Sequence, residues 1–337
     1  SGESSMTWKV PVSERLGLQV ELTNHCNAAC HACARVWLVK NKDKKNWHEY
    51  DLSVNDNYVS LEDFKGWVDK DKWTRLKRIL FCGNYDEPTI NPDVIEICKW
   101  IIDSKTLFPA LPKITISTNG GARNEEFYSE LGKLSKDNPN RLKVNFGIDG
   151  FEDTNHLYRV NVKWEKLQKN WRAYIAAGGE AWWQWIEFSH NSHQKHLVAD
   201  YAKKEGFVKI KRINSWRPNV AGAKNVGYIE KKVSSKIVPD CYKNTLDSQG
   251  IFINYQGYMT PCCWMGTNSG FKGLADNFSK ENGLDGHKLN GTNSIQSMFD
   301  SQWFTDFAVA MEAGKIPVCT TKCKENKTNY YNFQDIR

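Results

Sequence analysis

Three cysteines, Cys26, Cys30 and Cys33, lie within one eight-residue segment near the start of the chain. Thiolates spaced in this way bind soft or borderline metals, because sulfur is a soft donor and a bound cation lowers the pKa of each thiol. A structural zinc ion is one candidate, with His25 or His31 as its fourth ligand. The other is a 4Fe-4S cluster in which three cysteines leave one iron open. The spacing alone leaves both candidates open.

The composition of the whole chain is that of an ordinary globular protein. It has 337 residues, 40% hydrophobic and 25% charged, and this length fits about two domains. No run reaches the roughly 18 apolar residues of a membrane span, and the N-terminus lacks a secretory-signal pattern. Ten cysteines without such a signal predict reduced, metal-binding thiols and a cytoplasmic location.

Two features of the composition point only weakly to nucleic acid. The net charge is +7, but basic residues are interspersed with acidic ones, and the densest cluster, 40–45, has the pattern of a solvated loop. The chain also contains fourteen tryptophans, including Trp182, Trp183 and Trp185 in one apolar run. Packing in the core explains these rings better than a base-stacking surface does.

The elements that must position the cysteines alternate regularly between strands and helices. Helix start signals occur at Ser60, Asn91 and Asn124, each before apolar residues at helical spacing. Six strands alternating with helices predict a parallel sheet covered by helices, either doubly wound or curled into a barrel. The strands, short apolar runs typical of buried parallel sheets, lie at 17–22, 78–82, 113–117, 143–148, 182–188 and 208–213.

Polar and glycine-rich segments follow the predicted strands at their carboxyl ends. In both parallel architectures, ligands bind at these ends. The cysteine segment follows the first strand, and the other such segments are 83–88, 118–121, 149–150 and 189–191. We therefore expect one binding site that is assembled from several strand ends.

The last hundred or so residues contain no further strand–helix units. A hairpin pattern spans 251–263, a helix is expected at 301–313, and Cys241, Cys262, Cys263, Cys319 and Cys323 all fall here. A small thiol-rich part is typical of a domain organised by a metal cluster. The predicted domains are therefore a lead-in at 1–16, in which Ser1 to Ser5 are set aside as an appended segment, a core at 17–233, and a second domain at 234–337.

Taken together, these motifs resemble those of the radical S-adenosylmethionine (SAM) superfamily, in its branch with a C-terminal SPASM or twitch extension. Cys26-x3-Cys30-x2-Cys33 after a first strand is similar to the cluster motif of that superfamily. The resemblance extends from about Gly17 to Cys323. It implies an α/β fold, a partial (β/α)6 TIM-like barrel with a small C-terminal α+β iron-sulfur domain.

The resemblance also implies a site for S-adenosyl-L-methionine along the strand ends. Residues 83–88 stand where the family has Gly-Gly-Glu-Pro, with two additional residues. Arg159 fits the partner of the SAM carboxylate. Ala32 replaces the aromatic residue that commonly precedes the third cysteine, so another residue must hold adenine. The implied SAM-binding residues are Gly83, Asn84, Asp86, Glu87, Ser117, Thr118, Asn119, Asp149, Arg159, Ser189 and His190.

In the C-terminal part, Gly257-x4-Cys262 is similar to the Gly-x4-Cys element of the extension. The resemblance implies a second, auxiliary 4Fe-4S cluster with four cysteine ligands, as in the twitch form. Cys263 competes with Cys262 for one position, and the spacing from the glycine favours Cys262. The implied ligands are Cys241, Cys262, Cys319 and Cys323.

The implied activity is that of an oxidoreductase or transferase-type radical SAM enzyme, with Cys26, Cys30 and Cys33 as catalytic cluster ligands. Reduction of the cluster by an external flavodoxin- or ferredoxin-type donor cleaves SAM to a 5'-deoxyadenosyl radical, which removes a hydrogen from the substrate. A peptide or protein substrate is the first expectation. The alternatives are dehydrogenation or epimerisation of a small sugar or alcohol, nucleic-acid modification, and a non-enzymatic zinc or redox protein.

Overall fold

The computed structural model describes residues 11–31, 33–36, 57–214, 250–266, 278, 282–283, 285–322 and 331–337. The strands of these residues form one sheet in the order β8-β7-β1-β2-β3-β4-β5-β6-β9. Strands β1 to β6 are parallel to one another, which confirms the predicted parallel architecture and fits a partial TIM-like barrel. They span Gly17–Val20, Arg78–Phe81, Lys113–Thr118, Leu142–Gly147, Glu180–Glu187 and Lys209–Asn214.

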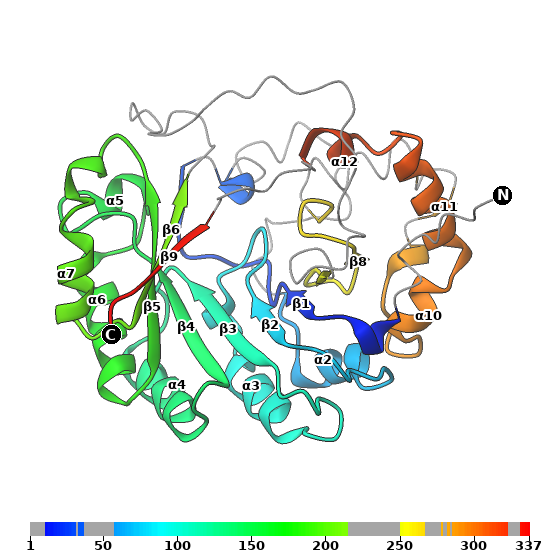
Figure 1. Ribbon diagram of the computed structural model, residues 1–337, viewed down its shortest axis with the longest axis horizontal. Helices are drawn as coiled ribbons and strands as arrows, with labels where there is room; N and C mark the ends of the chain where they lie inside the picture. Colours follow the sequence, from blue (N-terminus) through cyan, green and yellow to red (C-terminus); the bar gives the residue numbers. More distant parts are fainter. Residues whose placement is uncertain are drawn as a thin grey trace.

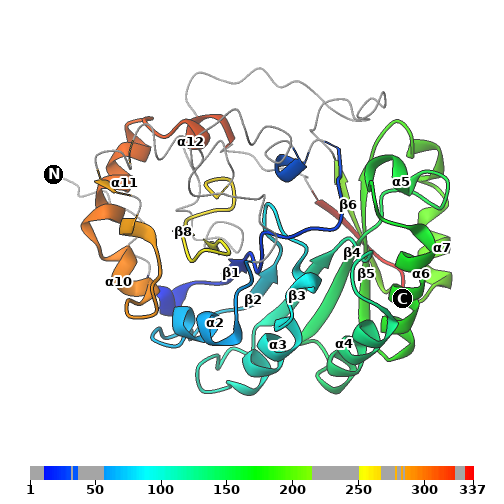
Figure 2. The same cartoon turned by 180° about the vertical axis from the view of Figure 1, so that it is seen from behind.

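Helices cover one face of this sheet, and the strands line the opposite, concave face (Figures 1 and 2). This arrangement follows from β–α–β connections, each of which returns the chain to the same sheet. The covering helices are α2 (Leu61–Val68), α3 (Val94–Asp103), α4 (Glu125–Asp137), α6 (Trp164–Ala176) and α7 (Val198–Lys204), and the short α5 (Asn155–Tyr158) follows β4.

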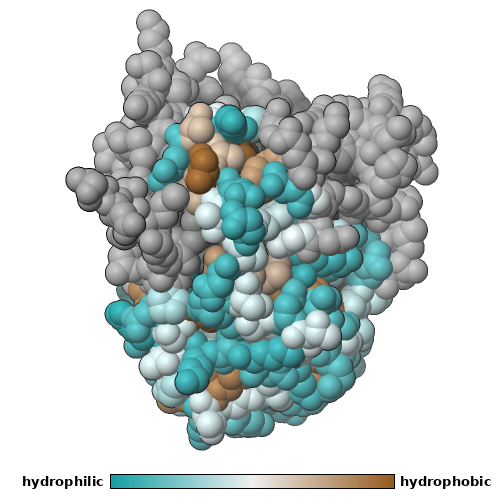
Figure 3. Space-filling model, turned by 90° about the vertical axis from the view of Figure 1, so that its right-hand side faces the viewer, coloured by the Kyte–Doolittle hydropathy of each residue, from teal (hydrophilic) through white to brown (hydrophobic). Residues whose placement is uncertain are grey.

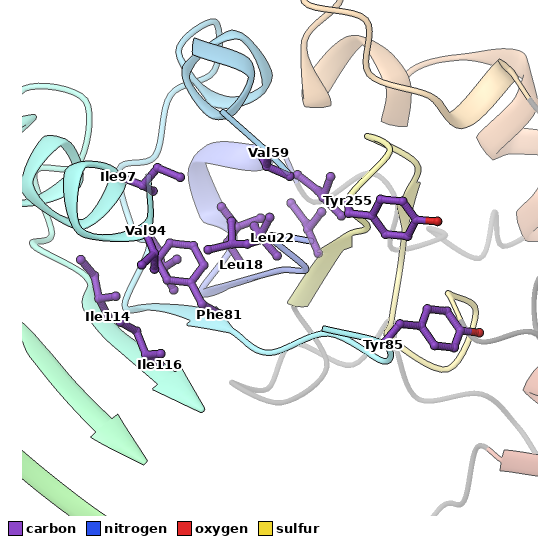
Figure 4. Packing of buried hydrophobic residues seen from close by; sticks show 14 of the residues in the cluster. Leu18, Leu22, Val59, Phe81, Tyr85, Val94, Ile97, Ile114, Ile116 and Tyr255 are labelled. Carbon is purple, nitrogen blue, oxygen red and sulfur yellow. The ribbon is translucent and has the colours of Figure 1, made fainter. Parts of the chain in front are cut away.

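Alternate residues along each strand point to opposite faces of the sheet. Ile114 and Ile116 of β3 are fully buried and pack toward α3, near Val94 and Ile97 (Figure 4). The residues of β3 that alternate with them, Lys113, Thr115 and Ser117, therefore face the concave side. Trp183 of β5 contacts Trp171 of α6 on the helix-covered face, so the predicted core role of this tryptophan is confirmed.

Local signals in the sequence account for several helix starts. Ser60 accepts from the backbone N–H of Asp63, and the Asp63 carboxylate accepts from the backbone N–H of Ser60, which completes a capping box before α2. Asn124 caps α4. Helix α7 begins at Val198, after Ser192–Gln194 form a 3-10 turn in which the Gln194 amide oxygen accepts from the Thr154 hydroxyl.

The C-terminal part extends the same sheet at both edges. Strand β7 (Gly250–Ile253) pairs in parallel with β1, and β8 (Met259–Thr260) returns antiparallel through a turn in which Gly257 has a φ of +86°. This confirms the predicted hairpin. Strand β9 (Tyr331–Asp335), which the sequence analysis did not predict, pairs antiparallel with β6 at the other edge.

Three C-terminal helices, α10 (Ile295–Phe299), α11 (Gln302–Glu312) and α12 (Pro317–Lys322), continue the arc beyond β8 (Figure 1). Helix α11 matches the helix predicted at 301–313. The predicted domain boundary at 233/234 falls within 215–249, and the basic cluster 40–45, which is expected to be a solvated loop, falls within 37–56. Both segments lie outside the described residues, so these two remain predictions.

The side of the molecule that carries α11 is largely hydrophilic where its residues are described, and hydrophobic residues are seen there as small separate areas (Figure 3). Among the described large hydrophobic side chains, Val309 of α11 has the highest exposed fraction, 55%. In the described part of the chain, no helix combines the length and the apolar character needed to cross a bilayer.

Candidate active site at the carboxyl ends of the strands

The cysteine segment lies directly after β1 and is held by the loops that follow neighbouring strands. The backbone N–H of Glu87, after β2, donates to the carbonyl of His25 at 2.8 Å, and that of Ala29 donates to Val160 at 2.9 Å. These bonds place Cys30 in a buried position and leave Cys26 and Cys33 half-buried. The segment is therefore fixed at the strand ends, where parallel sheets bind ligands.

The three thiols are close enough to influence one another. Burial raises the pKa of Cys26, and the carboxylate of Glu87 and the thiols of Cys30 and Cys33 raise it further. Burial also raises the pKa of Cys30, while the nearby Arg159 guanidinium lowers it. Three thiolates in such a place require a compensating cation, which a metal centre supplies.

Two side chains from other strand ends direct N–H groups at these sulfurs. The amide nitrogen of Asn119 lies 3.7 Å from Sγ of Cys26, and Nη1 of Arg159 lies 4.0 Å from Sγ of Cys30. Hydrogen bonds to ligand sulfurs are one of the means by which proteins tune iron-sulfur clusters. The donor set and its surroundings therefore fit a cluster held by three cysteines.

Arg159 is oriented by a fully buried carboxylate at the end of β4. Oδ2 of Asp149 accepts from Nε of Arg159 at 2.7 Å, and Oδ1 accepts from the backbone N–H of Ile186 at 2.7 Å. A Cβ at Gly147 would lie only 2.6 Å from Nη2 of Arg159, so the guanidinium requires glycine there. The result is a fixed cation beside the cysteines, suited to a ligand carboxylate.

Glu87 links the loops after β2 and β3. Its Oε1 accepts from the hydroxyls of Thr118 at 2.5 Å and Thr89 at 2.8 Å, and its Oε2 accepts from the backbone N–H of Asn119 at 2.7 Å. Burial raises the pKa of Glu87, and these hydrogen bonds oppose that effect. Glu87 thus holds Asn119 in place beside Cys26.

Residues 20–183, which contain all these groups, match the model of the radical SAM superfamily. Residues 20–183 of this chain are a radical SAM domain. Solved structures with similar folds extend the match into the C-terminal part. No curated protein sequence matches the chain.

Streptococcus suis SuiB with bound S-adenosylmethionine is 14% identical at a TM-score of 0.50, and the match covers 76% of this chain and 62% of SuiB. SuiB with its precursor peptide SuiA is 12% identical at a TM-score of 0.54, and the match covers 93% of this chain and 72% of SuiB. The enzyme anSMEcpe with bound AdoMet is 14% identical at a TM-score of 0.54, and the match covers 94% of this chain and 92% of anSMEcpe. These likenesses concern the fold, and the chain spans less than two thirds of the first of these structures.

The Gly83–Pro88 loop of the radical SAM domain is organised by two further carboxylates. Asp86 accepts from the backbone N–H groups of Gly83 at 2.6 Å and Leu22 at 3.0 Å. Burial, opposed by these bonds, raises its pKa to about 7. The Asp86 carboxylate thus ties the longer loop to the end of β1, and its predicted contact with SAM stays a prediction.

Glu21 is the second of these carboxylates, and the sequence analysis missed it. Oε1 of Glu21 accepts from the backbone N–H groups of Asn84 at 2.8 Å and Tyr85 at 2.7 Å, and burial, together with the charge of Asp86, raises the pKa of Glu21. A side chain at Gly83 would collide with Glu21. The available signal was an acidic residue at the end of an otherwise apolar strand.

The other predicted SAM-binding residues lie around the same strand ends. Asn84 donates to the carbonyl of Cys263 at 2.8 Å and so joins the radical SAM domain to the C-terminal part. Ser117 lies on the concave face, 3.4 Å from the amide nitrogen of Asn145. The His190 ring stacks on Phe188 at 5.3 Å, and burial lowers its pKa. Ser189 adjoins it, half-buried.

After β5, the sequence analysis placed Asn191 in the polar segment 189–191 but did not include it among the SAM-binding residues. The fully buried Asn191 amide donates to the backbone carbonyls of Asp149 at 2.7 Å and Ile186 at 2.8 Å. Asn191 thereby joins the ends of β4 and β5. Its place within the predicted polar segment 189–191 was the available signal.

The predicted auxiliary ligands are described only in part. Cys241 and Cys323 lie outside the described residues. Sγ of Cys319, on α12, lies 3.9 Å from Sδ of Met265, whose backbone N–H donates to the carbonyl of Cys262 at 3.1 Å. The structure thus brings Cys319 into the neighbourhood of Cys262 from a distant part of the sequence.

Two further cysteines lie on α3 and after β2, and Cys98 of α3 is fully buried in the core. Cys82 follows β2 on the concave face, and burial raises its pKa to about 12. Within the described residues, no three His, Cys, Asp or Glu side chains converge closely enough to hold one metal ion.

Proposed function

We propose that the protein is a radical SAM enzyme in which Cys26, Cys30 and Cys33 hold a 4Fe-4S cluster with one iron open to S-adenosylmethionine. When bound, these groups supply reductive cleavage of SAM and abstraction of a substrate hydrogen by the resulting 5'-deoxyadenosyl radical. The observation that carries the proposal is the fixed cysteine segment, with N–H donors from Asn119 and Arg159 at two of its sulfurs. An external one-electron donor completes the system.

In this proposal the residues at the strand ends bind and orient SAM. Arg159, positioned by Asp149, binds the SAM carboxylate, because a guanidinium offers parallel N–H groups to a carboxylate. Asn119, fixed by Glu87, directs its amide toward the same place. The burial of Asp149 and Glu87 keeps this region poor in water, which protects a reactive radical.

The auxiliary cluster is the second part of the proposal. Cys262 and Cys319, which the fold brings into one neighbourhood, would be two of its four ligands, with Cys241 and Cys323 as the others. Four thiolates leave no open iron, so this cluster would accept or relay an electron from the substrate radical. Such a role favours net oxidation or bond formation.

A peptide or protein is the first candidate for the substrate. Its support is the fold shared with SuiB over 93% of this chain, in a structure with a bound precursor peptide. A small polar metabolite is the second candidate, and one observation favours it. The concave face carries polar side chains such as Gln19, Asn145 and Gln184, which suit a hydroxylated ligand.

The decisive experiment is anaerobic reconstitution with iron and sulfide, followed by metal analysis and an assay for 5'-deoxyadenosine after reduction with dithionite. We expect iron and SAM cleavage in the wild type and in Cys98→Ala, whose thiol is in the core. Cys26→Ala should lose the open-iron cluster and SAM cleavage. Zinc without iron, or equal SAM cleavage by the two variants, would reject the proposal and favour a zinc or redox protein.

The auxiliary cluster has a separate test. Cys319→Ala should retain some uncoupled SAM cleavage, because Cys26, Cys30 and Cys33 are intact, and should contain less iron than the wild type. Iron analysis and electron paramagnetic resonance of the reduced protein measure this difference. An unchanged iron content in Cys319→Ala would remove Cys319 from the ligand set.

A further inference from the structure

The concave face of the sheet carries a group of basic side chains that the proposed SAM site does not use. In parallel register, paired residues point to the same face, and Asn145, Trp182 and Lys209 occupy one such row. Lys143 lies two residues before Asn145 and therefore also faces the concave side. The basic concave-face residues of β2 to β6 are Arg78, Lys113, Lys143, Lys209 and Lys211.

Two of these lysines meet at one tryptophan. Nζ of Lys143 lies 3.2 Å and Nζ of Lys209 lies 4.6 Å from the ring centroid of Trp182. The sequence analysis predicted that Trp182 packs in the core, and this is wrong. The Trp182 ring lies outside the core under the helices and faces two cations. Phe333 of β9 packs against the same ring at 6.0 Å.

Two carboxylates act on these lysines, that of Glu180 on Lys143 and that of Asp335 on Lys209. Neither lysine forms an ion pair within the described residues, and the Glu180 carboxylate also accepts from the Trp182 indole at 2.9 Å. Asp335, across from Lys209 in β9, is itself paired with Arg337. Burial lowers the pKa of Lys143 to about 8; the Glu180 carboxylate opposes this effect, and the neighbouring Lys113, Lys209 and Lys211 add to it.

A buried polar atom lies next to these cations. Asn145 is 3% exposed, and its amide nitrogen is directed at Oε1 of Gln184 at 2.9 Å, while its Oδ1 has no partner within the described part of the chain. A buried polar atom of this kind costs free energy unless a ligand satisfies it. Asn145 therefore offers a second contact beside Lys143.

We propose that the substrate carries an anionic group, a carboxylate or a phosphate, that binds to Lys143 and Lys209 on the concave face of the sheet beside Asn145. This inference rests on the proposed function, because it concerns the substrate of the same enzyme. Gly147, which adjoins Arg159, lies four positions after Lys143 in β4, and this corresponds to about 13 Å along a strand. The substrate is therefore extended, with its anionic end distant from the hydrogen that is removed.

The test is isothermal titration of the reconstituted protein with sodium phosphate and with sodium succinate at low ionic strength. We expect saturable binding of at least one anion to the wild type, weakened about tenfold or more in Lys143→Met and in Lys209→Met. Lys143→Arg should retain binding, because the charge remains. Lys99→Met is the matched control, since Lys99 pairs with Glu96 on the outer surface, and it should bind like the wild type.

Preference for phosphate would identify a phosphorylated substrate and preference for succinate a carboxylate, and either supports the site. Failure of both anions to bind the wild type, or equal binding to Lys143→Met, would overturn the inference. Formation of 5'-deoxyadenosine by the wild type is measured separately. Anion binding without SAM cleavage would reject the proposed function alone, and SAM cleavage without anion binding would reject this inference alone.

Discussion

The acidic residues at the strand ends mainly hold the protein together. Glu87, Asp86 and Glu21 each accept at least two hydrogen bonds from the protein itself, and these bonds fix the loops after β1, β2 and β3. Arg159 and Asn119, by contrast, direct N–H groups at cysteine sulfurs. Residues that build the site and residues that face its ligand are thus mixed within the same short motifs.

Arg159→Lys tests the role of the guanidinium. Arginine can bind Asp149 through Nε and still direct its Nη groups at a ligand, whereas a single ammonium group cannot do both. We expect the Kd of SAM to rise by about tenfold or more, because one charge-assisted hydrogen bond is lost. Equilibrium binding of SAM to the reconstituted protein is the measurement.

Arg172→Lys is the matched control for this change, because Arg172 is exposed and pairs with Glu205 on the outer surface. Its Kd for SAM should equal that of the wild type. If Arg159→Lys also binds SAM like the wild type, the SAM carboxylate is bound elsewhere.

Which site residues a sequence reveals depends on how local their signals are. The spacing of Cys26, Cys30 and Cys33 is a contiguous pattern, and polar strand ends are visible in the sequence. The role of Glu21 is not, because it depends on backbone N–H groups more than sixty residues away. The place of Trp182 is hard to see, since Trp182 and Trp183 are adjacent and only the polar Gln184, two residues after Trp182, marks the concave side.

At the scale of elements, close contact between helices depends on residues without side chains. Gly132 in α4 faces α6, and a Cβ there would come too close to the carbonyl oxygen of Tyr174 and to the Cβ of Ala177. The two helices can pack at this distance because position 132 is glycine. The sequence predicted both helices but not this contact, which depends on tertiary structure.

Gly132→Ala should therefore destabilise the protein by about 1–3 kcal/mol, because the backbone of α6 has to move. Gly66→Ala on α2 is the matched control. Its nearest neighbour is Gly291 Cα at 3.7 Å, an ordinary contact, so the better helix propensity of alanine should raise stability by about 0.5–1 kcal/mol. Urea unfolding followed by circular dichroism measures both, and equal effects would contradict the packing argument.

At the scale of the molecule, one buried carboxylate of the radical SAM domain contributes to the attachment of the C-terminal helices. Oδ2 of Asp71, beyond α2, accepts from the backbone N–H of Ile295 at 2.8 Å, and Oδ1 accepts from that of Gln296 at 2.9 Å. The side chain thereby caps α10 from a distant segment. Gln296 in turn accepts from the backbone N–H of Val12 at 2.7 Å.

Asp71→Ala should loosen this attachment at a cost of about 1.5–3 kcal/mol, because two N–H groups lose a charged acceptor. Amide hydrogen exchange at 295–312 should accelerate, while exchange in β3 and β4 stays slow. Asp69→Ala is the control, since Asp69 is exposed beside Lys70. Uniform acceleration over the whole protein by Asp71→Ala would indicate global destabilisation instead.

The pairing of β1 with β7 has a consequence for how the protein folds. Gly17–Val20 pairs on one side with β2 and on the other with Gly250–Ile253, more than two hundred residues later. During synthesis, the edge of β1 that pairs with β7 stays unpaired until β7 leaves the ribosome, and the cysteine segment follows directly after β1. Such a long-range contact slows folding and exposes an edge to aggregation. Cluster insertion at Cys26, Cys30 and Cys33 is accordingly expected to follow chain completion, and chaperones that shield this edge should raise the yield of cluster-loaded protein.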